Sequence, residues 1–262
     1  MMIAGLRRGF ARSLTTATRP LLASTAMKAP VRAFCAGAEA PTPIVEHPEF
    51  ERGLVLFEKE CVGEAIDSFS TAAAAGSPGG NFFLALGYDG LLGENAEGEP
   101  WIDINAEAAF RCYERAAEAG HAEAAMNLAL CYKNGDGVGR NIRKAFETME
   151  LSAALGSDRA QFNLGVSLDP LQPPWGSPGE VAPEEAMILK DPTRAMAFYQ
   201  QASAQGHGKA KVNLGIFLYT ATVPGTEPDR AAAEELWKEA MEDGVPEVRC
   251  PERAPCSCTA LT

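Results

Sequence analysis

The sequence lacks the patterns that usually identify a membrane protein or an enzyme. No apolar run reaches the roughly 18 residues that a membrane-spanning helix needs. There is no phosphate-binding loop, dinucleotide-binding glycine motif, nucleophile elbow or zinc-protease motif. Histidine, the usual general base, occurs only three times. We therefore predict a protein with no membrane span, catalytic residue, bound metal or cofactor.

The cysteines do not form a disulfide framework. Their number, seven, is odd and their spacing is irregular, so free thiols in a reducing compartment are expected. Cys250, Cys256 and Cys258 lie together, but three thiols without a fourth ligand fall short of a zinc site. The interpretation of residues 245–262 is an extended tail, with a redox pair or metal clip at Cys256 and Cys258 as the alternative.

Acidic residues are absent from the first 38 positions, which hold six basic ones. The rest of the chain carries 17 basic and 35 acidic side chains, a net charge of −18. Such an acidic body repels phosphate backbones, so nucleic acid is not an expected partner. An acidic body would attract basic proteins. The predicted partners are therefore proteins, which are either basic or part of a multi-subunit complex.

The composition of residues 1–38 is that of an organelle transit peptide. This leader is rich in Arg, Ser and Thr, and it lacks the compact apolar core of a secretory signal. We expect it to be disordered and removed, leaving a mitochondrial protein in the matrix or associated with the inner membrane. A plastid transit peptide and a basic N-terminus of a cytosolic protein remain alternatives. Residues 39–47 are predicted to be a linker.

Five glycines recur at intervals of 36 to 50 residues, and each follows a helical segment with the same pattern. Eleven residues before the glycine the residue is Ala, seven before it is large, and four before it is small. These steps place the three positions on one helix face, where the small residues allow close approach of neighbouring helices. The glycine itself can adopt the left-handed conformation that ends a helix. The five are Gly76, Gly120, Gly156, Gly206 and Gly244.

A second helix is predicted after each glycine, because FLALGY (83–88), NLALCY (127–132) and NLG (163–165 and 213–215) recur there. Repeats of this length indicate stacked helical hairpins. The segment AMNLALCYKNGDGVGRNIRKAFETMELSAALG (125–156) resembles the Sel-one-like repeat, a relative of the tetratricopeptide repeat. The resemblance covers roughly residues 50–244. It implies an all-α, right-handed α/α superhelical solenoid of about five helix-turn-helix repeats.

The predicted repeat solenoid spans residues 48–244. Two long intervals are explained by insertions at residues 90–105 and 169–191, each inside a hairpin and hence at the same edge of the solenoid. The expected helices are 48–60, 63–75, 81–91, 106–119, 121–134, 141–155, 157–168, 192–205, 207–219 and 229–243.

Two kinds of residue are candidates for protein binding. Trp101 and Trp175 lie in the two insertions, and aromatic residues in long loops can anchor a partner. The alternative is that each loop folds back and packs its Trp on the nearest hairpin. Asn127, Asn163 and Asn213 share one slot, where an amide can hold an extended peptide backbone in a concave groove. The alternative is a bond to a neighbouring turn or helix that sets the hairpin geometry.

The histidines are predicted to cap helices. His121 and His207 occupy the position after a terminal glycine that Ser77 and Ser157 fill in other repeats. No nucleophile and base pair is visible. The resemblance to the Sel-one-like repeat and the leader of residues 1–38 together favour a non-enzymatic mitochondrial scaffold, adaptor or assembly factor. The alternatives are an accessory subunit of a respiratory-type complex and a hydrolase of the β-lactamase-like repeat type. The leader argues against an endoplasmic-reticulum adaptor.

Overall fold

The computed structural model describes residues 46–172 and 190–245, and these ranges contain ten α-helices and one isolated bridge. The predicted leader, most of the linker, most of the second insertion and nearly all of the tail lie outside the described residues. No described helix is long and apolar enough to cross a membrane. The helices are α2 (Pro48–Glu58), α3 (Val62–Ala74), α4 (Pro78–Tyr88), α5 (Ala106–Glu118), α6 (Ala122–Asn134), α7 (Ile142–Ala154), α8 (Asp158–Leu168), α9 (Pro192–Ala204), α10 (Gly208–Thr220) and α11 (Arg230–Glu242).

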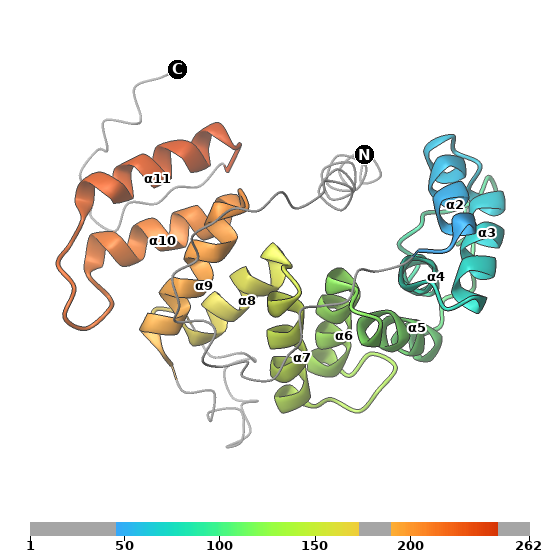
Figure 1. The fold of residues 1–262 in the computed structure, drawn as a ribbon, viewed down its shortest axis with the longest axis horizontal. Helices are drawn as coiled ribbons and strands as arrows, with labels where there is room; N and C mark the ends of the chain where they lie inside the picture. The colour runs from blue at the N-terminus through green and yellow to red at the C-terminus, as the bar shows by residue number, and fades with distance from the viewer. Residues whose placement is uncertain (1–45, 173–189, 246–262) are drawn as a thin grey trace.

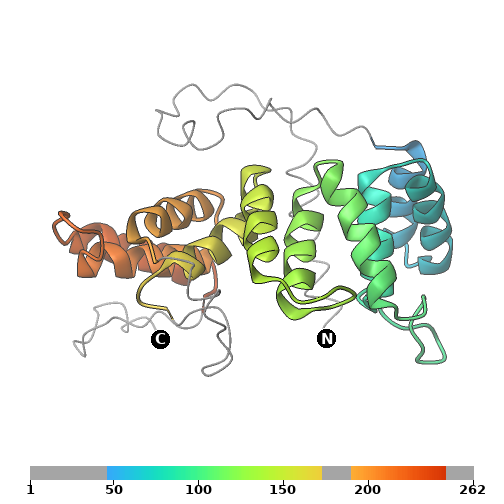
Figure 2. The ribbon, with the colours of Figure 1, turned by 90° about the horizontal axis from the view of Figure 1, so that it is seen from below.

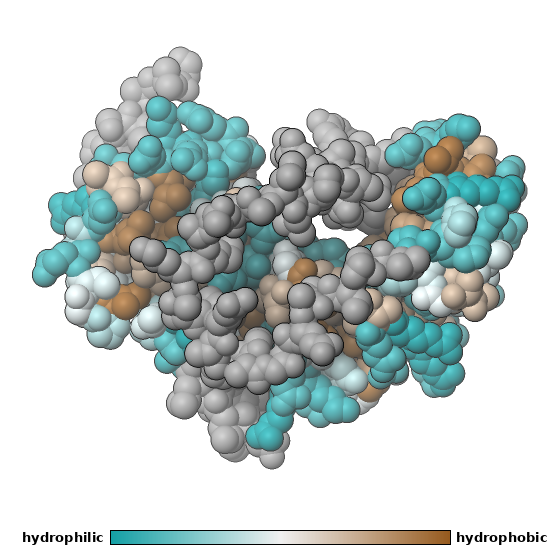
Figure 3. All heavy atoms as spheres, viewed as in Figure 1, coloured by the Kyte–Doolittle hydropathy of each residue, from teal (hydrophilic) through white to brown (hydrophobic). Residues whose placement is uncertain are grey.

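The ten helices form five hairpins that stack in sequence order, which confirms the predicted all-α solenoid. Each helix packs mainly against the helix before it and the helix after it. The hairpins follow an arc that opens toward the top of Figure 1. Figure 2 shows the loop between α4 and α5 and the loop between α6 and α7 on the same, lower side of the solenoid. Hydrophilic side chains predominate on the face seen in Figure 3, with smaller apolar patches over both ends.

The three-position pattern of the sequence corresponds to the packed face of the second helix in every hairpin. All five Ala residues and all five small residues have no exposed surface, and the large residues are at most 2% exposed. Each of the five terminal glycines has a positive φ, as a left-handed helix end requires. The large residues are Phe69, Tyr113, Met149, Tyr199 and Trp237.

The large residue of the second helix lies against a glycine of the first helix in three hairpins. A Cβ added to Gly53 would lie 2.5 Å from Phe69 Cε1, and one added to Gly165 would lie 2.6 Å from Tyr199 Cδ1. Gly215 is equally close to the indole of Trp237. The third hairpin has Ala129 at this slot, where the sequence departs from the repeat pattern. Its facing residue is the flexible Met149, which packs in the same buried cluster.

The contact between Gly53 and Phe69 predicts that Gly53→Ala destabilises the wild type but stabilises a Phe69→Met variant. In the wild type the added methyl meets the ring of Phe69, and overpacking is expected to cost about 2 kcal/mol of unfolding free energy. In a Phe69→Met background the ring is gone, and the higher helix propensity of Ala should stabilise by about 0.5 kcal/mol. Urea unfolding of the four proteins tests this double-mutant cycle. Equal effects in both backgrounds would contradict it.

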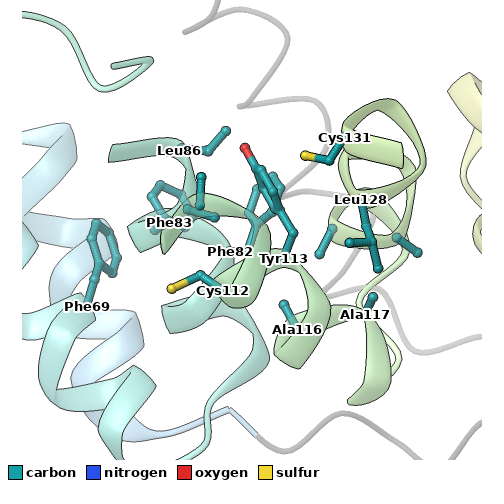
Figure 4. Packing of buried hydrophobic residues seen from close by; sticks show 14 of the residues in the cluster. Phe69, Phe82, Phe83, Leu86, Cys112, Tyr113, Ala116, Ala117, Leu128 and Cys131 are labelled. Atoms are coloured by element: carbon teal, nitrogen blue, oxygen red, sulfur yellow. The ribbon is translucent and has the colours of Figure 1, made fainter. Parts of the chain in front are cut away.

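Aromatic side chains fill the space between the first and second hairpins. The rings of Phe69 and Phe83 stack with centroids 4.4 Å apart, and Phe82 meets Phe83 edge-on. Figure 4 shows the ring of Tyr113 between Phe82 and the helix that carries Cys131. The core is therefore continuous from one hairpin to the next, and each hairpin depends on its neighbours for burial.

Candidate functional site

The first insertion, residues 90–105, folds as a hairpin on the end of α4. At its base the Asn105 N–H donates to Tyr88 O over 2.9 Å, and near its tip the Asn95 N–H donates to Glu99 O over 2.7 Å. Inside the base, Ile102 is so close to Gly87 that a Cβ there would lie 2.5 Å from Ile102 Cδ1. We call this element the 90–105 hairpin. Its backbone bonds and the contact of the half-buried Ile102 with Gly87 hold it against the end of α4.

Three large apolar side chains of the 90–105 hairpin remain exposed. Leu91 is 49% exposed, Trp101 is 38% exposed and Ile104 is 68% exposed. The ring of Trp101 lies beside Gly63 at the start of α3, where a Cβ would be 3.5 Å from Trp101 Cζ3. Trp101 therefore has one side against the preceding hairpin and the other open. The contact with Gly63 fits the alternative in which the loop folds back on the nearest hairpin, and a role of Trp101 in protein binding stays a prediction.

The second insertion is described only at its two ends. Trp175 lies outside the described residues, so its predicted role in binding stays a prediction. At the first end Asp169 is buried and Leu171 is 54% exposed. At the other end Lys190 donates from Nζ to Ser167 O over 3.0 Å and to Gln172 O over 3.2 Å. This lysine therefore ties the two ends of the insertion together.

The three asparagines lie where one hairpin packs on the next, and all are half-buried. Asn213 Nδ2 donates to the hydroxyl of Tyr199 over 3.0 Å. Asn127 makes the corresponding bond with Tyr113. Asn163 follows a hairpin with Met149 in place of tyrosine, and its Nδ2 donates instead to Arg159 O in its own helix over 2.8 Å. Two of these amides thus bond to the preceding hairpin. A role of the row in peptide binding stays a prediction.

Each tyrosine hydroxyl also donates to an aspartate that the sequence analysis did not single out. Tyr113 donates to Asp89 Oδ2 over 2.7 Å, and Tyr199 donates to Asp169 Oδ2 over 3.0 Å. Both aspartates directly follow the first helix of their hairpin. A sequence signal existed, because an Asp stands at this place only in the two hairpins whose large residue is Tyr and whose loop is long.

The pKa of both aspartates is raised. For Asp169 the main cause is burial, which the bonds from Leu171 and Tyr199 and the charge of Lys190 partly offset. Asp89 is exposed as a whole, but its contact with Tyr113 withdraws part of the carboxylate from water, and this desolvation raises its pKa. The hydrogen bond from Tyr113 lowers it, and the negative charge of Asp136 raises it further. The charge of Asp136 thus places Asp89 in a negative field.

The histidines cap helices, as predicted. His121 Nδ1 accepts from the Ala124 N–H over 3.1 Å, and His207 Nδ1 accepts from the Ala210 N–H over 3.2 Å. Each ring also stacks on a phenylalanine of the preceding hairpin with centroids 4.5 Å apart. Burial lowers the pKa of His121 to about 4 and lowers that of His207. Each imidazole makes a backbone hydrogen bond and a ring contact, and within the described part of the chain neither is paired with a nucleophile.

The described cysteines are free thiols, as expected. Cys61 is exposed, whereas Cys112 and Cys131 are buried. Burial raises the pKa of the Cys131 thiol to about 12, so it stays protonated and unreactive at neutral pH. In residues 46–172 and 190–245 no three His, Cys, Asp or Glu side chains converge as a metal site would require. The cysteines of the tail lie outside these ranges.

Comparison with known proteins identifies the class of repeat. The Sel1 repeat family matches residues 84–121, 122–157, 184–207 and 208–245, more than half of the chain, and the protein belongs to this family. A Sel1 repeat protein from Oxalobacter formigenes has 23% identity and a TM-score of 0.59, over 74% of this chain and 70% of that one. A protective antigen with an SLR fold from uropathogenic Escherichia coli has 21% identity and a TM-score of 0.57, over 75% and 38%.

One curated relative is similar over part of its length. Protein SHC1 of Saccharomyces cerevisiae is 28% identical over an aligned length of 159 residues, and the match covers 47% of this chain and 31% of SHC1. The chain therefore matches less than a third of that relative. Sel1 repeats generally act in protein–protein interaction without catalysis, and they imply protein partners for this chain.

Proposed function

We propose that this protein is a mitochondrial interaction scaffold or assembly factor that binds its partners through the 90–105 hairpin. The observation that carries the proposal is the exposure of Leu91, Trp101 and Ile104 on one well-held loop. The three repeated packing positions of each second helix are buried between helices, so those side chains are unavailable to a partner. Exposed apolar and aromatic side chains on a rigid element are typical of binding anchors.

The mitochondrial part of the proposal is supported by the leader. Its six basic residues, its lack of acids and its Ser and Thr content fit a transit peptide. A fluorescent protein fused to residues 1–38 should co-localise with a mitochondrial marker. A fusion that stays in the cytosol, or enters the plastid of a plant cell instead, would overturn this assignment and leave the scaffold proposal standing.

Partner binding is tested with the full chain, tagged at its C-terminus and expressed in cells that lack the untagged protein. Native gel electrophoresis of isolated mitochondria should show the wild type in a complex larger than the chain. A Leu91→Ser, Trp101→Ala, Ile104→Ser variant should run as a smaller species, because three anchors are lost.

Leu151→Ser provides the matched control, because Leu151 is 46% exposed on α7, away from the 90–105 hairpin. This variant should keep the complex. Circular dichroism of the purified proteins verifies that helix content is unchanged. A wild-type chain that migrates alone, or a triple variant that keeps the complex, would overturn the proposed function.

A further inference from the structure

The two insertions end at equivalent residues, which allows them to be compared position by position. Asn105 caps α5 by accepting from the Ala108 N–H, and Asp191 caps α9 by accepting from the Arg194 N–H, in both cases over 3.0 Å. The residue before each cap is therefore the same position in the two hairpins. That residue is Ile104 in the α4–α5 hairpin and Lys190 in the α8–α9 hairpin.

In the α8–α9 hairpin this position supplies a cation. The ammonium group of Lys190 is held by two backbone carbonyls, and its positive charge lowers the pKa of Asp169 against the effect of burial. A buried carboxylate needs such compensation, because removal from water disfavours the charged form. The α8–α9 hairpin thus compensates the negative charge of its own aspartate with a lysine of the same hairpin.

In the α4–α5 hairpin the corresponding aspartate, Asp89, lacks this cation. Ile104 stands at the lysine position and is 68% exposed. The stretch from Asp89 to Glu107 contains six acidic residues and no Lys or Arg. Within the described residues, the only ion pair made by these six acids joins Glu107 to Arg111. The exposed apolar side chains of the 90–105 hairpin therefore lie in a stretch of chain whose acidic residues, apart from Glu107, form no ion pair within the described residues.

We propose that the 90–105 hairpin binds a basic, apolar segment of a partner protein. This segment places a Lys or Arg side chain beside Asp89, where Lys190 serves Asp169 in the other hairpin. Its apolar side chains contact Leu91, Trp101 and Ile104. The inference rests on the proposed function and adds the chemistry of the partner. The net charge of −18 outside the leader also attracts such a segment before contact.

The probe is a fluorescein-labelled synthetic peptide of alternating Lys and Leu, titrated with the purified full chain and followed by fluorescence anisotropy. Peptides of Lys and Ser and of Glu and Leu should bind at least about tenfold more weakly, because each lacks one half of the proposed contact. Binding should also weaken as salt is raised, since exposed charges are screened. Equal binding of the Lys/Ser peptide would overturn the apolar half of the proposal. Equal binding of the Glu/Leu peptide would overturn the charge half.

Two substitutions test the position of the cation. Asp89→Asn removes the charge but keeps an oxygen that accepts the Tyr113 hydroxyl, and it should weaken binding of the Lys/Leu peptide about tenfold. Ile104→Lys gives the α4–α5 hairpin its own cation, as in the α8–α9 hairpin, and should weaken binding by at least as much. Leu151→Lys makes the same kind of change on α7 and should bind like the wild type. Binding by I104K equal to that by L151K would overturn the proposal.

Other occupants of the hairpin give distinct results. If the probe binds only when residues 1–38 are removed, the basic leader of this chain occupies the surface. If light scattering shows that the chain dimerises and I104K prevents it, the occupant is a second copy. Either result overturns the assignment to a separate partner. In mitochondria, loss of the complex in the triple variant but not in I104K would retain the proposed function and reject this inference alone.

Discussion

Replacing Tyr199 by Ala is expected to lower the free energy of unfolding by about 4 kcal/mol. Tyr199 has no exposed surface and lies between Gly165 of α8 and Phe217 of α10. Truncation leaves a cavity between two hairpins, and it also leaves the buried Asp169 without its hydroxyl donor. Domains of this kind are stable by about 5–15 kcal/mol, so the change removes a large share of the total.

Hydrogen exchange should show where this stability is lost. Each hairpin contacts only its neighbours, so α8 to α11 should lose protection while α2 to α5 keep it. Tyr199→Phe separates the two causes, because it keeps the ring and removes the hydroxyl, and it should cost about 1–3 kcal/mol. Leu151→Ala, at an exposed site, should change stability by at most about 0.5 kcal/mol. A uniform loss of protection along the chain would contradict the nearest-neighbour account.

The helices were predictable because their sequence signal and their packing have the same cause. A helix that packs on both neighbours needs Ala at the closest approach and a large side chain between, and Ala65 and Phe69 show this pair in the first hairpin. The expected bounds agree with the structure within a few residues. The largest difference is α4, which begins at Pro78 and not at residue 81, because Ser77 caps it and proline fits the first turn.

The asparagine row shows what a repeat slot alone cannot tell. The sequence places Asn127, Asn163 and Asn213 at one position, but the bond each makes depends on the large residue of the preceding hairpin. Where that residue is a tyrosine, the amide bonds to its hydroxyl. Met149 offers no acceptor, and Asn163 turns to its own helix. The hydrogen-bond partner of each amide therefore depends on two positions: the asparagine slot and the large residue of the preceding hairpin.

The insertion could be located from the sequence, but its conformation could not. The contact of Trp101 with Gly63 joins parts of the chain that share no repeat position, so no periodic pattern indicates it. The correspondence of Asp89 with Asp169 could be read from the sequence, because each lies 13 residues after a terminal glycine, Gly76 or Gly156. The bond of each aspartate to its tyrosine could not, because the loops that separate the two residues differ in length.

The second large expected effect is a dependence of the unfolding free energy on pH. It arises because His121 is neutral in the folded protein. Burial lowers its pKa from 6.5 to about 4, against the raising effect of Glu123. The unfolded chain therefore binds a proton that the folded chain does not, and stability falls as pH decreases. This contribution is fully present above pH 6.5 and is lost as pH falls toward 4. The shift corresponds to about 3 kcal/mol between these limits.

His121→Ser is expected to reduce this pH dependence by nearly the whole amount. Serine retains the cap, as Ser77 and Ser157 do in other hairpins, but it does not titrate. The variant gives up the stacking on Phe82, so it should be less stable than the wild type at pH 7 and closer to it at pH 4. Urea unfolding of both proteins between these pH values measures the difference.

The difference between variant and wild type separates the contribution of the histidine to the pH dependence of stability from that of the carboxylates. The raised pKa of Asp89 and Asp169 acts with the opposite sign, since these groups favour the folded state at low pH, but it is common to both proteins. His207→Ser should show the same direction as His121→Ser, because the pKa of His207 is also lowered by burial. If the free-energy difference between H121S and wild type stayed constant from pH 7 to pH 4, His121 would not be buried as a neutral cap.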